Sequence, residues 1–350
     1  MKEGKTGYTT GTCAAAAAKA AALLLTKGTS PPEAEVLLPE GRRVTLPVAY
    51  ARHIVDGAEA AVRKDAGDDP DITQGALVVV RLSPLPGSKI LFAAGEGVGT
   101  VTKPGLSVPP GEAAINPVPR QMIAGAIGEI TPQGMVVTVS IPGGEKLAEK
   151  TYNPRLGITG GLSVLGTTGI VRPFSISALR ASLQCALDVA VACGVGAPVF
   201  VPGHIGRRAA ERNFSLREGQ IIETGNEWGF VLDRAAGLAF REILVVGHPG
   251  KLVKLAMGDW DTHSARSGSA LIIVAQRAEE LFGRSFSGQV TAEGVFASLA
   301  PEEARQLGDA LAGEVCRAIA GKTGHSRTAA AFADMQGRIV GTAGDLRPWQ

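Results

Sequence analysis

Hydrophobic positions follow different patterns in the two halves of the chain. In residues 1–150, short apolar runs surround a few helical segments, which predicts an α+β domain with a mixed sheet. Eight of the nine residues from 14 to 22 are alanine, and Thr12 precedes them as a candidate N-cap, so a helix is expected there. Another helix is predicted over residues 51–66.

From about residue 151, strand and helix patterns alternate. Apolar runs predict strands at 161–165, 198–201, 220–223 and 243–246. The helix after the first run has apolar residues at steps of three and four, namely Ile176, Leu179, Leu183, Leu187 and Val191. Repeated βα alternation predicts a parallel sheet. We therefore expect an α/β protein, with an α+β domain over 1–150 and a Rossmann-like domain over 151–350.

Composition excludes several classes of protein. The 350 residues are 45% hydrophobic with a formal net charge of +2, which is typical of a globular protein and argues against binding to nucleic acid or a membrane surface. The apolar run 14–25 is too short to span a bilayer. Four scattered cysteines without Cys-x-x-Cys spacing predict no metal site and a reducing, cytoplasmic location. A homo-oligomer stays open.

Polar and glycine residues follow the predicted strands. Ligands bind beyond the carboxyl ends of parallel strands, so we expect a small-molecule site there, with an ordinary turn as the alternative at each position. Glu223 is a candidate acceptor for ribose hydroxyls. The ends read Gly166-Thr167-Thr168-Gly169, Pro202-Gly203-His204, Glu223-Thr224-Gly225-Asn226 and Gly247-His248-Pro249-Gly250-Lys251.

Three further segments carry polar groups with two possible roles. Asp259 and His263 could move a proton, or cap a helix. Thr9, Thr10, Gly11 and Thr12 stand at a helix start, where they could bind an anion or cap the helix. The four aspartates of 65–71 are interpreted as a solvated turn, because the spacing of a calcium loop is missing.

Several of these motifs together resemble the CbiD family, in order from about residue 4 to 345. They are Gly7-Tyr-Thr-Thr-Gly-Thr-Cys-Ala14, Lys64-Asp-Ala-Gly-Asp-Asp-Pro-Asp71, Gly166-Thr-Thr-Gly169, Gly225-Asn226, His248-Pro-Gly-Lys251 and Gly258-Asp-Trp-Asp-Thr-His263. The resemblance implies anaerobic cobalamin biosynthesis. S-adenosylmethionine would donate a methyl group to C-1 of cobalt-precorrin-5B, giving cobalt-precorrin-6A, and cobalt would belong to the substrate.

Under this resemblance the polar residues receive hypothetical roles. Domain 151–350 would hold S-adenosylmethionine, and domain 1–150 would contribute to macrocycle binding. Proton removal is assigned to Asp259 and His263. Cofactor binding is assigned to Gly166, Thr167, Thr168, Gly169, Glu223, Thr224, Gly225 and Asn226. Binding of the corrinoid carboxylates is assigned to Thr9, Thr10, Gly11, Thr12, Arg172, His248 and Lys251.

The position of the candidate acid departs from that of ordinary Rossmann methyltransferases, which carry a ribose-binding acid at the end of their second strand. If 161–165 is the first strand, the acid Glu223 ends the third strand.

Two alternative functions stay open: a phosphotransferase using Gly95-Glu-Gly-Val-Gly99 as a phosphate loop, and a non-catalytic corrinoid-binding protein. The first lacks a nearby lysine, and the second lacks an Asp-x-His-x-x-Gly cobalt-ligand motif.

Overall fold

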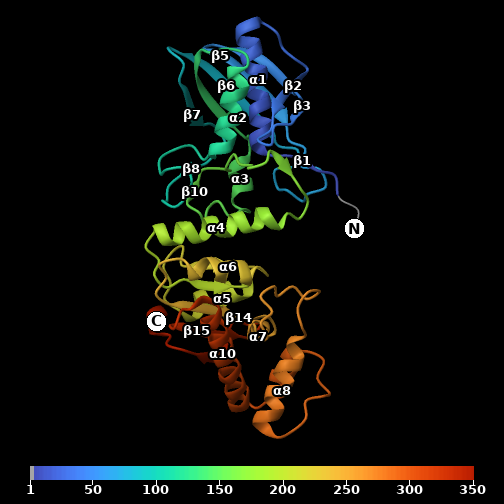
Figure 1. The fold of residues 1–350 in the computed structure, drawn as a ribbon, viewed down its shortest axis with the longest axis vertical. Coiled ribbons are helices and arrows are strands. Elements are labelled where there is room, and N and C mark those ends of the chain that lie inside the picture. Colours follow the sequence, from blue (N-terminus) through green and yellow to red (C-terminus); the bar gives the residue numbers. More distant parts are fainter. Residues whose placement is uncertain (1–3) are drawn as a thin grey trace. The chain divides into compact units, whose positions relative to one another are not determined.

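The computed structural model describes residues 4–350, which form two compact units that meet in sequence at Ala178 and Leu179. Both units combine helices with sheets, so the chain is an α/β protein with mixed sheets (Figure 1). The division falls later than the predicted boundary at residue 150. The reason is that β10 (Ile158–Thr159) and β11 (Ile170–Val171) pair with strands of the first unit.

The main sheet of the first unit has five strands in the order β4-β5-β6-β9-β7. All neighbours are antiparallel except β7 and β9. The predicted helix over 51–66 is wrong, because a turn at Val55 and Asp56 folds this segment into the β4–β5 hairpin. The Asp-Gly pair at 56–57 is a local hairpin signal. The strands are β4 (Tyr50–Ile54), β5 (Gly57–Arg63), β6 (Leu77–Leu85), β7 (Ile90–Ala94) and β9 (Gly134–Ser140).

Helix α1 (Thr10–Lys27) forms the centre of the first unit's core. Its alanines from 14 to 18 expose none of their surface, and these small side chains let the helix backbone lie close to its neighbours. It packs against α2 (Pro117–Gly128), β5, β6 and β2 (Glu33–Leu37), which forms a hairpin with β3 (Arg43–Pro47) (Figure 1). A helix that is apolar all round is expected in a core.

Short elements complete the first unit. β1 (Gly7–Tyr8) pairs with β11, and β8 (Thr100–Val101) pairs with β10, while α3 (Gly144–Ala148) follows β9. Residues 161–165 were expected to open the parallel sheet, and that expectation is wrong. Val164 instead bridges to Ile115, and its side chain joins the first unit's core.

The second unit is built on a five-stranded sheet in the order β13-β12-β14-β15-β16. The strands are parallel except β16, which is antiparallel to β15. This confirms the predicted parallel sheet, with β12 as its first strand and β13 as its second. The strands are β12 (Val199–Val201), β13 (Ile221–Glu223), β14 (Ile243–Gly247), β15 (Thr328–Ala333) and β16 (Ile339–Ala343).

Helices cover both faces of this sheet. One core joins the α6, α7 and α10 side chains to the strands, and a smaller core on the other side contains α5 residues and Trp349. The helices are α4 (Ile176–Ala192), α5 (His204–Asn213), α6 (Trp228–Ala236), α7 (Pro249–Ala256), α8 (Ala270–Phe282), α9 (Ala292–Ala297), α10 (Pro301–Thr323) and the 3₁₀ helix η1 (Arg347–Trp349).

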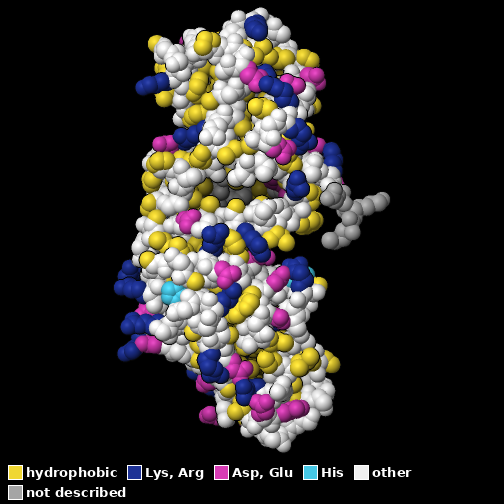
Figure 2. All heavy atoms as spheres, viewed as in Figure 1, with side chains coloured by type: hydrophobic (Ala, Val, Ile, Leu, Met, Phe, Trp, Pro, Cys, Tyr) yellow, Lys and Arg dark blue, Asp and Glu magenta, His cyan; other side chains and the backbone are white. Residues whose placement is uncertain are grey.

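Two general surface properties follow. Among residues 4–350, no helix combines the length and the apolar character that crossing a bilayer requires. On the face shown in Figure 2, acidic side chains are interspersed with basic ones, as expected from the small net charge.

Candidate functional site

The start of α1 is tied to the segment that precedes β11. The N-cap of α1 is Thr9 and not the predicted Thr12: the Thr9 Oγ1 atom accepts a hydrogen bond from the Thr12 N–H at 3.2 Å, so Thr12 lies in the first turn of the helix. The Gly11 N–H donates to the Leu165 carbonyl at 3.1 Å, and the Thr12 hydroxyl donates to the Gly169 carbonyl at 2.7 Å. Substrate binding by Thr9, Thr10, Gly11 and Thr12 stays a prediction, and it would need groups that already have protein partners.

The Gly166–Gly169 loop lies in the first unit, so it does not end a strand of the parallel sheet. A Cβ at Gly166 would lie 2.4 Å from the Thr9 Oγ1, and one at Gly169 would lie 2.7 Å from the Leu38 Cδ2. Packing against Thr9 at Gly166, and against Leu38 and Thr12 at Gly169, therefore explains both glycines. Thr167 and Thr168 are exposed. Cofactor binding by this loop stays a prediction, but a bulky residue at Gly169 would disturb the fold as well.

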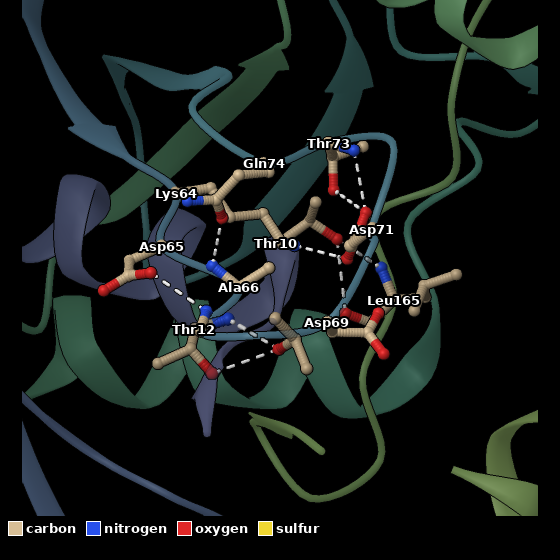
Figure 3. Close-up of polar contacts among 12 residues, drawn as sticks. Thr10, Thr12, Lys64, Asp65, Ala66, Asp69, Asp71, Thr73, Gln74 and Leu165 are labelled. Atoms are coloured by element: carbon tan, nitrogen blue, oxygen red, sulfur yellow. Dashed lines mark hydrogen bonds and ion pairs between the residues drawn. The ribbon is translucent and has the colours of Figure 1, made fainter. Parts of the chain in front are cut away.

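A buried ion pair between Lys64 and Asp71 lies near the start of α1 (Figure 3). Lys64 exposes 2% of its surface, and its Nζ donates to the Asp71 Oδ2 at 2.5 Å. The other Asp71 oxygen accepts from the N–H and the hydroxyl of Thr73, at 2.7 and 2.6 Å. Burial alone would raise the pKa of Asp71, but the hydrogen bonds from Lys64 and Thr73 outweigh it and hold the pKa below its ordinary value.

The remaining aspartates of this segment also hold structure together. The Asp65 carboxylate pairs with Lys5 at 2.9 Å, and the Asp69 carboxylate accepts from the Phe174 N–H at 3.0 Å. The aspartate segment thus joins the parts of the first unit around Lys5 and Phe174.

The Cys13 thiol is not suited to nucleophilic catalysis. The charge of Lys64 lowers the pKa of this thiol, but burial outweighs that effect and raises the pKa to about 12. A neutral thiol of this kind is not a nucleophile at neutral pH.

The Gly95–Gly99 segment does not have the open backbone of a phosphate loop. A Cβ at Gly97 would lie 2.0 Å from the Ile141 carbonyl oxygen, and one at Gly95 would lie 2.1 Å from the Ser140 Oγ. The Gly95 and Gly99 N–H groups donate to the carbonyls of Val139 and Leu162. Tight packing therefore accounts for the glycines, and the geometry gives the phosphotransferase alternative no support.

In the second unit, the turn between β12 and α5 has a different character. A Cβ at Gly203 would meet nothing within 4 Å, whereas one at Gly206 would lie 2.5 Å from the Val246 carbonyl oxygen. Gly203 thus leaves open space at the strand end, and Gly206 lets α5 pack closely on β14. These are two of the roles that glycines have in nucleotide-binding turns. The turn lies where strand order reverses, since β13 and β14 flank β12 on opposite sides.

Glu223 ends β13 beside this turn. Its Oε1 accepts from the Arg207 Nε at 2.5 Å, so α5 fixes the carboxylate. The buried Thr224 hydroxyl donates to the Val201 carbonyl at 3.2 Å, which joins the ends of β13 and β12. With β12 as first strand, Glu223 ends the second strand, and the departure from ordinary Rossmann methyltransferases disappears. Glu223 follows Gly203 by 20 residues, close to the spacing of about 20 between a glycine turn and a ribose-binding acid.

Lys251, Asn226 and Thr262 meet in one hydrogen-bonded group. The Lys251 Nζ donates to the Asn226 Oδ1 at 2.5 Å and to the Thr262 carbonyl at 3.4 Å. Gly225, at φ 60°, takes a backbone conformation that favours glycine. Burial lowers the pKa of Lys251, and the nearby charge of Lys254 adds to this effect. The structure thus brings together two predicted residues that lie 25 positions apart in the sequence, Asn226 and Lys251.

His248 has a structural task at the start of α7. Its Nδ1 accepts from the Gly250 N–H at 3.1 Å, so in the neutral ring the proton is on Nε2. That nitrogen lies 2.5 Å from the Glu293 Oε2. The side chain therefore caps α7 and joins it to α9, and a role in substrate binding stays a prediction.

Asp259 and His263 each have a backbone partner of their own. The Asp259 Oδ2 accepts from the Gly268 N–H at 2.7 Å, and the His263 Nδ1 accepts from the Ala265 N–H at 3.2 Å. These bonds shape the loop between α7 and α8. A proton on His263 Nε2 makes the neutral ring a donor at that atom, so the predicted role in proton removal would fall to Asp259.

A cavity of about 340 Å³ lies beside the same loop. Its two aromatic rings already have cations over them: Arg180 and Arg234 lie 5.5 and 5.4 Å from the Phe230 centroid, and Lys322 lies 5.0 Å from that of Trp260. It is therefore a poor place to stack a nucleobase. The lining residues are Arg180, Glu227, Gly229, Phe230, Asp233, Arg234, Trp260 and Asp261.

The predicted site residues thus fall in both units. Thr9–Thr12, Gly166–Gly169 and the exposed Arg172 lie in the first unit, and the rest lie in the second. Sequence reasoning missed the roles of Gly203 and Gly206, because 161–165 was counted as the first strand. The spacing from Gly203 to Glu223 was the signal that could have found them.

Comparisons with known proteins agree on one family. Residues 1–173 match the family model described as CbiD. A Syntrophotalea carbinolica protein named cobalt-precorrin-5B C(1)-methyltransferase is 51% identical over 346 residues, 98% of each chain. A Burkholderia lata protein of the same name is 43% identical over 348 residues, 96% of each chain. A crystal structure titled cobalamin biosynthesis protein (cbiD), from Archaeoglobus fulgidus, is 28% identical and covers 75% of this chain and 82% of its own, with a TM-score of 0.40.

Identity at this level along nearly the whole length of both chains indicates common descent. The resemblance carried by the sequence motifs is therefore confirmed, and the chain belongs to the CbiD family.

Proposed function

We propose that this chain transfers a methyl group to C-1 of cobalt-precorrin-5B, the reaction for which its relatives are named. The observation that carries the proposal is the 51% identity over 98% of this chain and of the Syntrophotalea relative. The chain has the same extent as that relative, so both units described above belong to the comparison. A purely structural or binding role is not favoured, since the relatives are named as enzymes.

We further propose S-adenosylmethionine as the methyl donor, bound at the carboxyl edge of the second unit's sheet. An adenosyl ligand needs close backbone approach and an acid for its ribose hydroxyls. Gly203, with open space in front of it, and Glu223, held by Arg207, meet these two needs. Thr224, Gly225 and Asn226 continue from Glu223 and would line the adenosyl side. When bound, the sulfonium supplies a methyl group that is open to in-line displacement.

The chemistry asks little of the protein beyond positioning. The nucleophile is the electron-rich macrocycle, so the chain's contribution is to orient two reactants and exclude water. The buried thiol of Cys13, whose pKa is raised to about 12, has no part in such a reaction. Asp259 is the candidate for removing a proton after transfer, and His263, a donor at Nε2, is the candidate for keeping that loop in place.

Binding of the macrocycle is proposed for both units. In the first unit, the exposed side chains of Arg172, Thr167 and Thr168 are the candidates for ligand contact. The hydroxyls of Thr10 and Thr12 instead bind the carbonyls of Leu165 and Gly169, and Thr9 caps α1. In the second unit, Lys251 and His248 are the candidates. Cationic and hydroxyl groups suit a corrinoid that carries many carboxylates.

Isothermal titration with S-adenosylhomocysteine, beside ATP, tests the proposal. We expect a dissociation constant on the order of 10 μM for S-adenosylhomocysteine and no heat with ATP. Transfer of a labelled methyl group to cobalt-precorrin-5B under anaerobic conditions would then complete the test. Binding of ATP alone would contradict the proposal.

A further inference from the structure

Two lysines of α7 carry charges that no carboxylate of the described chain neutralises. Lys254 exposes only 8% of its surface, and its Nζ donates to the Ser267 hydroxyl at 2.6 Å. Lys251, one turn earlier, donates to the Asn226 amide oxygen and the Thr262 carbonyl. Over residues 4–350, neither ammonium has an acidic side chain within the 4.0 Å of an ion pair. All their partners are neutral oxygens.

The acids of the neighbouring loop are engaged elsewhere. The Asp261 carboxylate accepts from the Arg266 Nε at 2.5 Å and from the His263 N–H at 3.0 Å. The Asp259 Oδ2 accepts from the Gly268 N–H. These carboxylates weaken the positive potential around the two lysines, but they do not replace an ion-pair partner.

Lys254 is buried and Lys251 is half-buried, so keeping a charge on both ammonium groups is costly. Each loses part of its hydration, and they repel each other. The pKa of Lys251 is lowered first by burial and then by Lys254, and the charge of Asp261 opposes this without cancelling it. Buried charges in proteins are normally paired, so a buried ammonium beside a half-buried one, with no acid of the described chain within ion-pair distance, indicates a position for an external anion.

We infer that Lys251 and Lys254 form a binding site for a carboxylate group, with the Ser267 hydroxyl beside it. The inference rests on the proposed function, which offers two sources of that group: the amino-acid part of the methyl donor and the acid side chains of the macrocycle. Asn226, one of the proposed adenosyl-binding residues, already contacts Lys251, so the site is continuous with the carboxyl edge of the sheet.

The test uses the full chain with Lys254→Met and Lys251→Met, because methionine keeps the buried stem and removes the charge. Lys322→Met is the matched control, since the Lys322 ammonium already has a carboxylate partner, Asp233, at 2.6 Å. Binding is measured with two ligand pairs. S-adenosylhomocysteine is compared with 5′-methylthioadenosine, which lacks the carboxylate, and cobyrinic acid is compared with its heptamethyl ester.

We expect Lys254→Met to weaken one carboxylate ligand about tenfold or more and to leave its carboxylate-free counterpart unchanged. Loss for S-adenosylhomocysteine alone assigns the site to the methyl donor, and loss for cobyrinic acid alone assigns it to the macrocycle. Unchanged affinity for both, while wild type binds them, overturns the inference. So does an equal loss for the two members of each pair.

The melting temperature without ligand gives an independent reading. Because Lys254→Met removes a buried charge that has no acid beside it, its melting temperature should equal or exceed that of wild type. A clear fall would make Lys254 a structural residue and contradict the inference. A wild-type chain that binds neither carboxylate ligand would contradict the proposed function, and the melting temperature would still decide whether the charge is uncompensated.

Discussion

Each unit contains a buried lysine, and the two differ in what faces the ammonium. Lys64 in the first unit pairs with Asp71, whose second oxygen is bound by Thr73. Among the described residues, the hydrogen-bond partner of the Lys254 ammonium in the second unit is the Ser267 hydroxyl, and no carboxylate lies within ion-pair distance. A buried charge that is fully paired has nothing left for a ligand, and the removal of its partner destabilises the fold. A buried charge without an acid is explained by a ligand that supplies one.

Glycines show the same difference. At the motif glycines of the first unit, neighbouring atoms already occupy the space where a Cβ would lie, as Thr9 does at Gly166 and Ile141 does at Gly97. Gly203 in the second unit faces open space. Polar motifs near α1 therefore hold the first unit together, whereas Gly203 leaves open space at the carboxyl edge of the second unit's sheet.

The largest effect is expected from Asp71→Asn, which leaves the Lys64 charge buried without its partner. We expect a loss of about 3 to 5 kcal/mol in the free energy of unfolding, measured by urea denaturation. Glu40→Gln is the control, because Glu40 forms an exposed pair with Arg42 and its loss should change little. Equal stability of Asp71→Asn and wild type would refute the structural role of the pair.

The same pair predicts a pH dependence with a definite sign. The pKa of Asp71 in the folded chain lies below its ordinary value of 3.8, because the hydrogen bonds outweigh burial. Its stabilising contribution is therefore fully present above about pH 5 and is lost as the pH falls through the lower, folded value. The stability difference between wild type and Asp71→Asn should shrink only below about pH 4. A difference that shrinks toward pH 8 would point to another group.

Two alanine substitutions in one turn separate packing from binding. Gly206→Ala forces a Cβ against the Val246 carbonyl and should cost about 1 to 3 kcal/mol of stability. Gly203→Ala places its Cβ in open space, so stability should hold while affinity for S-adenosylhomocysteine falls. Thermal melts and titrations of both variants check this. If Gly203→Ala binds as wild type does, the proposed cofactor position is wrong.

Removal of the candidate ribose acid should weaken cofactor binding. Glu223→Ala is expected to weaken S-adenosylhomocysteine about tenfold, as the loss of a hydrogen-bonded charge implies. Glu211→Ala is matched to it, because Glu211 also pairs with Arg207, at 3.3 Å, but lies on α5 away from the strand end. Similar affinities for the two variants would show that the Glu223 carboxylate does not touch the ribose.

The smallest effect is expected from His263→Ala. With Nδ1 bound to the Ala265 N–H, this ring is placed to hold its loop, so kcat should stay within about threefold of wild type. Asp259→Asn tests the proton-removal role beside it and should lower kcat by more. A collapse of kcat in His263→Ala, with binding and melting temperature unchanged, would instead make His263 a catalytic residue.

The sequence predicted the parts of this protein that depend on local pattern. The alanine-rich α1, with its Thr9–Thr12 start, and the βα alternation of the second half are both present. Its failures concern pairing partners. Residues 161–165 are apolar enough for either unit, and only their bridges to Val98 and Ile115 decide that they join the first. The β4–β5 hairpin was missed because alanines near residue 60 also favour helix.

The candidate site shows the same limit. The motif residues were found, but their roles depend on side chains from distant segments. Asp71 looked like one acid of a solvated turn, and only the fold brings the Lys64 ammonium to it. The strand count that hid Gly203 also misplaced Glu223, because position in a sheet is set by long-range hydrogen bonds that one sequence does not show.

Hydrogen–deuterium exchange with and without S-adenosylhomocysteine tests the central claim most directly, since it locates the ligand in the intact chain. We predict protection at residues 202–207 and 223–226. Protection confined to residues 165–170, or binding without protection at the β12–α5 turn, would contradict the assignment of the methyl donor to the second unit's sheet.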